Sequence, residues 1–514
     1  MSAQATYPHG TARRFRAFET MVACGPLALV LVAAGGATLG AFAWYLSLTH
    51  FGGGTVLQEV ALVAALALGL AGAGALWYAY GAYFARRAGI GAVTAMRWNA
   101  LAWGVLPVYL VGFVAPPSIA DPSRSAALAA GLFALVTILV ASRFVRTVRD
   151  VLSTFVVTRL AIIVIAELAS IMIAQRPGSH IAESKIPLLA VWGRWDAVHY
   201  IDIAQRGYYG TDMAFFPLYP TLIHFVGLFI GNDLVAGLII SNVALFFGLL
   251  FFYKLVEHQY TRAVAHRAIF YVSIFPTAVF FSAVYTESLF FALTVASFYY
   301  IREHKWVLAG VVGAFAALTR VEGILLAVPY AIEVVAAARA GGLASVSTPK
   351  RAWRIVAGAC AIPLGLAIYM AALWVMNGDP LTFSHVQAHW DRHLAPPWVS
   401  IVHAFKLMLH ARSTLVIANE TIELTFTALM IGVLIAGFRR LRPSFSAYMA
   451  LSILVPMSTS SLMSMQRFAL VLFPMFAILA LWGGRSWVNN AIVAFSLPLL
   501  GLFTVLFADW YWVA

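Results

Sequence analysis

The sequence carries little charge and almost no cysteine. Only 10% of its 514 residues are Asp, Glu, Lys or Arg, whereas 62% are hydrophobic. Soluble globular domains carry about 25% charged residues, so this chain has too few to cover a water-facing surface. The two cysteines, Cys24 and Cys360, lie in apolar runs, which excludes a disulfide framework and a thiolate metal site.

Two other patterns are missing. The sequence shows no series of short segments that alternate polar and apolar residues, as the strands of a membrane barrel would. No Gly-rich phosphate loop follows a strand, as it would in a soluble nucleotide-sugar enzyme. Instead, apolar runs of roughly 20 residues, long enough to cross a bilayer core, recur along the chain. Because a segment in lipid must satisfy its own backbone hydrogen bonds, we expect an all-α polytopic membrane protein.

Positive charge is concentrated in short clusters between the apolar runs. The net charge is +13, and the main clusters contain Arg13, Arg14, Arg16, Arg86, Arg87, Arg143, Arg146, Arg149, Lys350, Arg351, Arg354, Arg439, Arg440 and Arg442. This distribution is typical of cytoplasmic loops beside anionic lipid headgroups. We therefore expect membrane lipids as partners and no nucleic acid. Arginine outnumbers lysine by 28 to 5, which favours the plasma membrane of a prokaryote.

The chain divides into two predicted domains at the charged segment 143–150. Residues 1–150 hold about four spans, near 21–48, 57–84, 98–116 and 125–142, almost free of ionisable residues. Such spans indicate packing, a partner surface or lipid contact. Residues 151–514 form the predicted core, whose polar loops hold the chemistry.

The core is predicted to contain about 11 spans when every basic cluster is kept cytoplasmic. The spans lie near 152–174, 234–254, 267–284, 288–302, 306–320, 323–338, 354–376, 413–437, 445–462, 467–483 and 488–509. The proline-flanked stretch 217–230 is predicted to be an interfacial or re-entrant helix. This topology places the N-terminus inside and the C-terminus outside.

Ionisable residues then gather on the extracytoplasmic side of the membrane. They lie in the polar segment 175–214, in the turn that contains Glu287, in the segment with Arg320 and Glu322, in the loop 377–411 and at Arg467. Charged groups at membrane depth are costly, and several that converge on one face favour a functional site over independent helix caps.

The residues that follow resemble one known family. Its motifs appear in order as WDAVHY (195–200), IAQRGY (203–208), FFPLYP (215–220), FPTAVF (275–280), YTESLF (285–290), TR with a following Gly (319–323), GDP (378–380) and RF before a Pro (467–474). Their order is similar to that of PIG-V-type mannosyltransferases, which add the second mannose of the GPI anchor. The segment TRVE at 319–322 departs from the more usual Thr-Arg-Pro, and residues 1–150 lie outside the resemblance.

The resemblance implies the fold and the reaction. The family belongs to the GT-C membrane glycosyltransferases, which implies a GT-C-like helical bundle. It also implies a polyprenyl-phosphate sugar as donor, a glycolipid or glycan as acceptor, and inversion at the sugar. Such a transfer needs a carboxylate to take the acceptor proton and cations for the leaving phosphate. Asp196 matches the catalytic acidic position of the family, whereas an alternative makes it the N-cap of a helix over 197–205.

Further side chains are expected to bind the substrates. Arg320 and Arg467 are the first choices for the phosphate, because a guanidinium offers a planar pair of donors. Trp195 suits stacking on a sugar face, and Glu287 either orients an acceptor hydroxyl or pairs with an arginine. The full set of expected substrate-binding residues is Trp195, Arg194, Tyr200, Arg206, Glu287, Arg320, Glu322, His385, Gln387 and Arg467.

Two alternatives remain open. His385, His389 and His393 repeat at a spacing that would form a metal-binding stripe on a helix. That stripe contains no carboxylate and is soon ended by Pro396, so no cofactor is expected and metal independence is predicted. The second alternative is a transporter or flippase of lipid-linked sugars, which also has many spans and buried charges. Charges at one interface would favour the enzyme, and charges at mid-span would favour transport.

Overall fold

The structure is a computed structural model of the chain. It describes residues 145–173, 176, 187–341 and 348–513, together with isolated positions between 71 and 96. The predicted spans 21–48, 98–116 and 125–142 lie outside the described residues. The chain separates into two compact units, Met1–Arg149 and Asp150–Ala514. The role assigned to each domain stays a prediction.

Helices are the regular structure of the described residues, with turns and irregular segments between them and an isolated bridge between Leu394 and Thr459. Six helical segments are long and apolar enough to cross a membrane. Four are whole helices: α10 (Asp233–Gln259), α16 (Pro349–Asn377), α19 (Thr414–Gly437) and α23 (Ser486–Ala508). The other two are Thr147–Met172 within α6 (Val145–Met172), and Val321–Gly341, which consists of η3 (Val321–Leu326) and α14 (Ala327–Gly341). Their lengths of 21 to 29 residues match a bilayer core of about 30 Å. The predicted polytopic helical membrane protein is therefore confirmed.

The remaining predicted spans fold into shorter helices. These are α11 (Arg262–Ser273), α12 (Glu287–Arg302), α13 (Trp306–Thr319) and α20 (Pro443–Met457), together with the pair α21 (Met465–Val471) and α22 (Phe473–Trp482), which is bent by 74°. Counting the bent pair as one span gives at most seven in the described part of the chain. Each of the other predicted core spans contains a shorter helix, and the total of about 11 core spans stays a prediction.

The span predicted at 267–284 shows why one of these helices, α11, is short. α11 ends at Ser273, and Pro276, which lacks a backbone donor, follows it. Arg159 of α6 donates from Nη2 to the Ser273 carbonyl (2.7 Å) and from Nη1 to the Ala278 carbonyl (2.8 Å). A buried arginine thus satisfies carbonyl groups that a continued helix would have used, and the chain turns through η2 (Ala278–Phe281).

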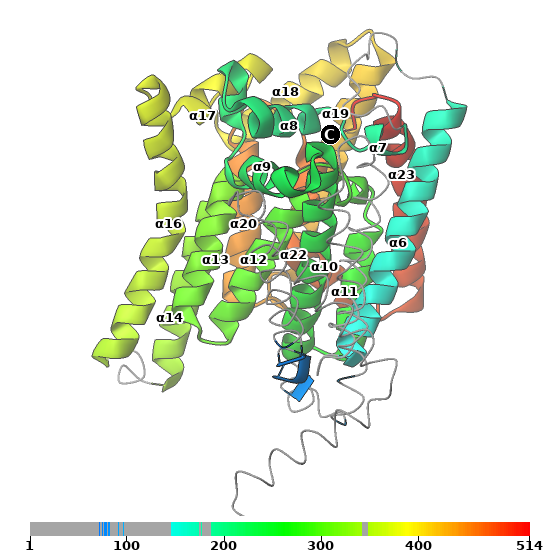
Figure 1. Cartoon of the computed structure of the whole chain (residues 1–514). Helices are drawn as coiled ribbons and strands as arrows, with labels where there is room; N and C mark the ends of the chain where they lie inside the picture. Colours follow the sequence, from blue (N-terminus) through cyan, green and yellow to red (C-terminus); the bar gives the residue numbers. More distant parts are fainter. Residues whose placement is uncertain are drawn as a thin grey trace, which may run out of the picture. The chain divides into compact units, whose positions relative to one another are not determined.

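Several short helices lie across one end of the long ones, the upper end in Figure 1. They are α8 (Asp196–Arg206), α9 (Leu218–Ile230), α17 (Thr382–His385) and α18 (Pro397–His410), accompanied in the chain by α7 (Pro187–Ala190), η1 (Gly210–Ala214) and η4 (Val386–Trp390). With 13 residues, α9 is too short to cross a bilayer core of about 30 Å. Its interfacial position stays a prediction.

The opposite end carries the basic connections. Glu333 of α14 accepts hydrogen bonds there from Arg302 (3.0 Å), Arg442 (3.2 Å) and Ser444 (2.6 Å). These contacts join the ends of α12, α14 and α20. Because α12 runs away from Glu287 and α13 runs back towards Arg320, both of these residues lie at the end opposite to this basic cluster.

Candidate active site

Asp196 follows a strained turn between α7 and α8. Trp195 has a positive φ of 58°, which is unfavourable for a residue with a large side chain. The Tyr285 hydroxyl holds this turn, because it donates to the Arg194 carbonyl (3.2 Å) and accepts from the Asp196 amide (3.2 Å). Asp196 is the first residue of α8, and Trp195 occupies the N-cap without a side-chain cap bond. The capping alternative for Asp196 was therefore wrong.

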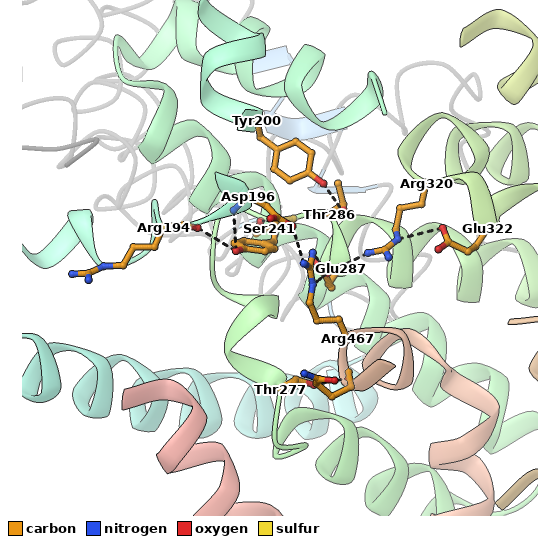
Figure 2. A network of polar contacts seen from close by, with 12 residues as sticks. Arg194, Asp196, Tyr200, Ser241, Thr277, Thr286, Glu287, Arg320, Glu322 and Arg467 are labelled. Carbon is orange, nitrogen blue, oxygen red and sulfur yellow. Dashed lines mark hydrogen bonds and ion pairs between the residues drawn. The ribbon is translucent and has the colours of Figure 1, made fainter. Parts of the chain in front are cut away.

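A chain of ion pairs begins at Asp196. Arg467 donates from Nη1 to Asp196 Oδ2 at 2.7 Å and from Nε to Glu287 Oε1 at 2.8 Å. Arg320 reaches the same Glu287 oxygen from Nη1 at 3.2 Å and Glu322 from Nε at 3.5 Å. Figure 2 shows these five side chains converging. Since Glu287 is fully buried, its charge needs such partners.

Helix ends place these side chains. Glu287 is the first residue of α12, where the helix dipole favours a carboxylate. Arg320 directly follows α13, and Arg467 lies in α21. The start of α21 is held by Glu423 of α19, whose two carboxylate oxygens accept the amides of Ser464 and Met465 at 2.8 Å each. A buried carboxylate thus fixes the short helix that carries Arg467.

A pocket of about 400 Å³ opens beside the ion pairs, within the usual range for small-molecule sites of roughly 300–1,000 Å³. Its polar lining contains Asp196, Tyr200, Arg320, Glu322, Gln387, Arg392 and Arg467, and its aromatic lining contains Phe215, Phe216, Phe383, Trp390, Phe468 and Trp512. Charged groups surrounded by aromatic rings could bind an anionic group and a sugar ring together.

Six of the expected site residues line this pocket, namely Asp196, Tyr200, Arg320, Glu322, Gln387 and Arg467. Glu287 lies directly behind them and accepts hydrogen bonds from Arg320 and Arg467. Of the two roles expected for it, the structure therefore shows the pairing with arginine. The Tyr200 hydroxyl also lies 3.3 Å from the Thr286 hydroxyl, next to Glu287.

Apart from Glu287, four expected residues do not line the pocket. The Arg194 guanidinium points away from the cluster (Figure 2) and lies 5.4 Å from the ring centroid of Trp510. Burial lowers its pKa to about 10, because water is removed from the charge. The Trp195 ring packs on Trp510 and Trp512, with centroid distances of 5.5 and 5.2 Å. The strained turn explains both positions, since it directs Asp196 inward and its two predecessors elsewhere.

The other two lie on the surface. Arg206 forms an exposed pair with Asp202 one helical turn earlier, so Asp202 is bound there rather than beside Asp196. The His385 side chain is 65% exposed, and its Nδ1 lies 2.7 Å from Asp379 Oδ2. Hydrogen bonds from the Leu381 amide and from His385 hold the pKa of Asp379 below its usual value.

The histidine stripe does not form. α17 ends at His385, the chain continues as the 3₁₀-helix η4, and Asp391 adopts the left-handed region with φ 54°. His385, His389 and His393 therefore do not lie one turn apart on a continuous α-helix, as the metal alternative required. Across the described ranges no group of three His, Cys, Asp or Glu side chains is arranged to hold a metal ion.

Several pocket residues were not predicted from the sequence, among them Arg392 and Trp512. Arg392 lies in the loop 377–411, which was predicted to be polar and extracytoplasmic. Trp512 belongs to a short aromatic segment after α23, which resembles an ordinary interfacial belt. No spacing rule relates either residue to Asp196, more than 180 positions earlier.

A comparison with protein families matches a segment that contains part of this site. Residues 135–358 match the family model described as Mannosyltransferase (PIG-V). The resemblance to PIG-V mannosyltransferases is therefore confirmed over these residues. The match includes Asp196, Glu287 and Arg320, and it supports a glycosyltransferase enzyme. The remaining PIG-V motifs and the pocket residues Arg392, Arg467 and Trp512 lie beyond the matched segment. No curated protein and no solved structure matches the chain.

Proposed function

We propose that the protein is an inverting GT-C-type glycosyltransferase. In this proposal it moves mannose from a polyprenyl-phosphate sugar to a glycan or glycolipid acceptor on the extracytoplasmic side of a prokaryotic plasma membrane. The observation that carries the proposal is the position of Asp196, which lines the pocket while its Oδ2 is held by Arg467 at 2.7 Å. The family match over residues 135–358 supports the transfer of a sugar.

Asp196 is suited to act as the general base. Its side chain is 22% exposed, and Oδ1 forms no hydrogen bond within the described residues. Oδ1 can take the proton of the acceptor hydroxyl while that oxygen attacks the anomeric carbon from the face opposite the phosphate. As the new C–O bond forms, the bond to the phosphate oxygen breaks and its electron pair leaves with the phosphate. Arg467, bound to Oδ2, orients the carboxylate.

The leaving group gains charge during this step. A polyprenyl-phosphate sugar is a phosphodiester with one negative charge, and the released polyprenyl phosphate carries close to two. Preorganised cations stabilise such a change best where water is excluded. The pocket supplies three guanidinium groups, those of Arg320, Arg392 and Arg467.

The position of the basic connections supports an extracytoplasmic site. The pocket lies at the helix ends that carry Asp196, Glu287 and Arg320, whereas Arg302 and Arg442 gather around Glu333 at the other ends. Cytoplasmic loops are enriched in arginine and lysine. The pocket therefore belongs on the side opposite to the basic loops in this proposal.

The position of the pocket charges at helix ends also argues against the transporter alternative. Asp196 begins α8, Glu287 begins α12 and Arg320 follows α13. A transporter site is usually built near the bilayer midplane from broken helices. Here the charges gather at helix ends on one side, which favours an enzyme acting at an interface.

The proposal is tested with purified protein in lipid nanodiscs. Synthetic polyprenyl-phosphate mannose and a glycolipid extract are supplied, and the products are analysed by mass spectrometry. We expect an acceptor enlarged by one hexose together with free polyprenyl phosphate. Release of polyprenyl phosphate without a glycosylated product, or no consumption of any polyprenyl-phosphate hexose, would contradict the proposal.

A further inference from the structure

We infer that Arg392 is the residue that binds the phosphate of the lipid donor. This inference rests on the proposed function and makes one assignment within it. The sequence directed attention to Arg320 and Arg467 for this role. The structure shows that these two arginines are already neutralised by carboxylates, and that Arg392 is not.

The charges of the pocket support this assignment. Arg467 forms salt bridges with Asp196 and Glu287, and Arg320 forms salt bridges with Glu287 and Glu322. These two arginines and three carboxylates sum to one negative charge, which would repel a phosphate. Within the described residues Arg392 forms no salt bridge. It is therefore the cation of the pocket that an incoming phosphate can pair with, without breaking an existing ion pair.

The hydrogen bonds of Arg392 leave most of its donors unused. A guanidinium carries five N–H donors, and Arg392 uses one of them, from Nη2 to the Met463 carbonyl. Its Nε is buried without a hydrogen-bond partner among the described residues. Burial also lowers the pKa of Arg392, because water is removed from the charge. An anion bound in the pocket would pair with the donors of Nη1 and Nη2 that make no hydrogen bond among the described residues.

The loop that carries Arg392 is held in place on both sides of the residue. The Ser460 hydroxyl donates to the Asp391 carbonyl at 2.6 Å, and the Ser460 amide donates to the His393 carbonyl at 3.0 Å. Two residues further on, the Ala395 amide donates to the Ser458 carbonyl at 3.0 Å. Donors fixed in this way need little reorganisation when charge develops on the leaving oxygen.

The rim of the pocket beside Arg392 suits a lipid chain. Leu394 and Val455 line the pocket and are 91% and 40% exposed. Pro456 lies between Val455 and the segment that fixes the Arg392 loop. A polyprenyl chain that leaves the pocket across these apolar side chains would keep its phosphate beside Arg392. The sugar would then extend towards Asp196.

The test measures binding of the leaving group rather than turnover. Farnesyl phosphate is titrated into purified full-length protein, and farnesol, which lacks the phosphate, serves as the control ligand. We expect Arg392→Ala and Arg392→Gln to weaken farnesyl phosphate binding about 10- to 100-fold, the range for losing hydrogen bonds to a charged group. Arg392→Lys should restore part of the affinity, because lysine keeps the charge without the paired donors. Farnesol binding should not change.

The control variant is Arg412→Ala, which removes an exposed positive charge outside the pocket and should bind like the wild type. Melting temperatures show whether each variant is folded, and Arg392→Gln keeps a donor for Met463 if the alanine variant is unstable. Wild-type affinity in a folded Arg392→Gln variant would overturn the inference while leaving the proposed function intact. Failure of the wild-type protein to bind farnesyl phosphate would overturn both.

A second ligand separates the donor phosphate from an acceptor phosphate. Dioleoyl phosphatidylglycerol in detergent micelles is titrated in the same way. If Arg392→Gln lost phosphatidylglycerol binding and kept farnesyl phosphate binding, Arg392 would serve an acceptor headgroup and the inference would be wrong. Loss of farnesyl phosphate binding alone supports it.

Discussion

Gln466 donates a hydrogen bond from Nε2 to the Val513 carbonyl at 2.9 Å. Gln466 directly precedes Arg467, and Trp195, which directly precedes Asp196, packs against Trp510 and Trp512. The short segment 510–513 after α23 therefore contacts the neighbour of each partner in the central ion pair. It is placed to set the geometry of the general base without supplying a reacting group.

The first prediction concerns this segment. Trp510→Leu removes the ring between Arg194 and Trp195, so the strained turn before Asp196 should shift. A displacement of about 1 Å can cost 100-fold in rate, and we expect kcat to fall about 10- to 100-fold with a small change in KM. Steady-state kinetics measures this, with Trp487→Leu, an exposed residue outside the active-site pocket, as the matched control. Equal kinetics in both variants would assign Trp510 to packing alone.

The second prediction concerns the base. Asp196→Asn keeps the shape of the side chain and removes the proton acceptor, so turnover should fall by roughly 10²- to 10⁴-fold. Donor binding, measured with farnesyl phosphate, should remain within a few-fold of the wild type. Asp202→Asn, which changes a surface carboxylate of the same helix, should stay active. Near-normal turnover in Asp196→Asn would limit this residue to a structural role.

The third prediction concerns the shared carboxylate. Glu287→Gln leaves Arg320 and Arg467 close together without the charge that both of them use. Breaking a buried ion pair from one side costs about 3–5 kcal/mol, so the melting temperature should drop clearly. Glu303→Gln, at an exposed helix end, should melt like the wild type. An unchanged melting temperature in Glu287→Gln would show that the ion pairs contribute little to stability.

The fourth prediction concerns sidedness. In a background without Cys24 and Cys360, a cysteine at Ser384, which lines the pocket, should react with an impermeant maleimide added outside intact cells. A cysteine at Ser486, which begins α23 after the basic connection at Arg485, should react only after permeabilisation. The reverse pattern would place the pocket in the cytoplasm and exclude the proposed extracytoplasmic reaction.

The fifth prediction concerns metal dependence. Arg392 lines the pocket and forms no salt bridge among the described residues, so it can bind the leaving phosphate without a metal. Turnover should therefore persist in EDTA at more than half of the untreated rate. A His385→Ala, His389→Ala variant should retain more activity than Arg392→Ala. If EDTA abolished turnover and an added divalent cation restored it, a metal rather than the guanidinium groups would carry the leaving-group charge.

The sequence by itself determined the class of the protein and part of its site. Low charge and recurring apolar runs require helices in lipid, because no water is present there to satisfy the backbone. The basic clusters and the alternation of spans were sufficient to bring Asp196, Glu287, Arg320 and Arg467 to one side. The motifs carried the family resemblance, which the match over residues 135–358 confirmed.

Only the tertiary structure decided which charges are neutralised and which side chains reach the pocket. Arg320, Arg392 and Arg467 have the same chemistry in the sequence, but their roles differ with distances to carboxylates that lie far away in the chain. The turn at Trp195 directs Arg194 away from the pocket. The length of α11 also depends on a distant contact, since Arg159 caps the carbonyl of its last residue, Ser273, and that of Ala278 beyond it. Hydropathy shows how apolar a segment is. The end of α11, however, is stabilised by Arg159, which lies 114 residues before Ser273 in the chain.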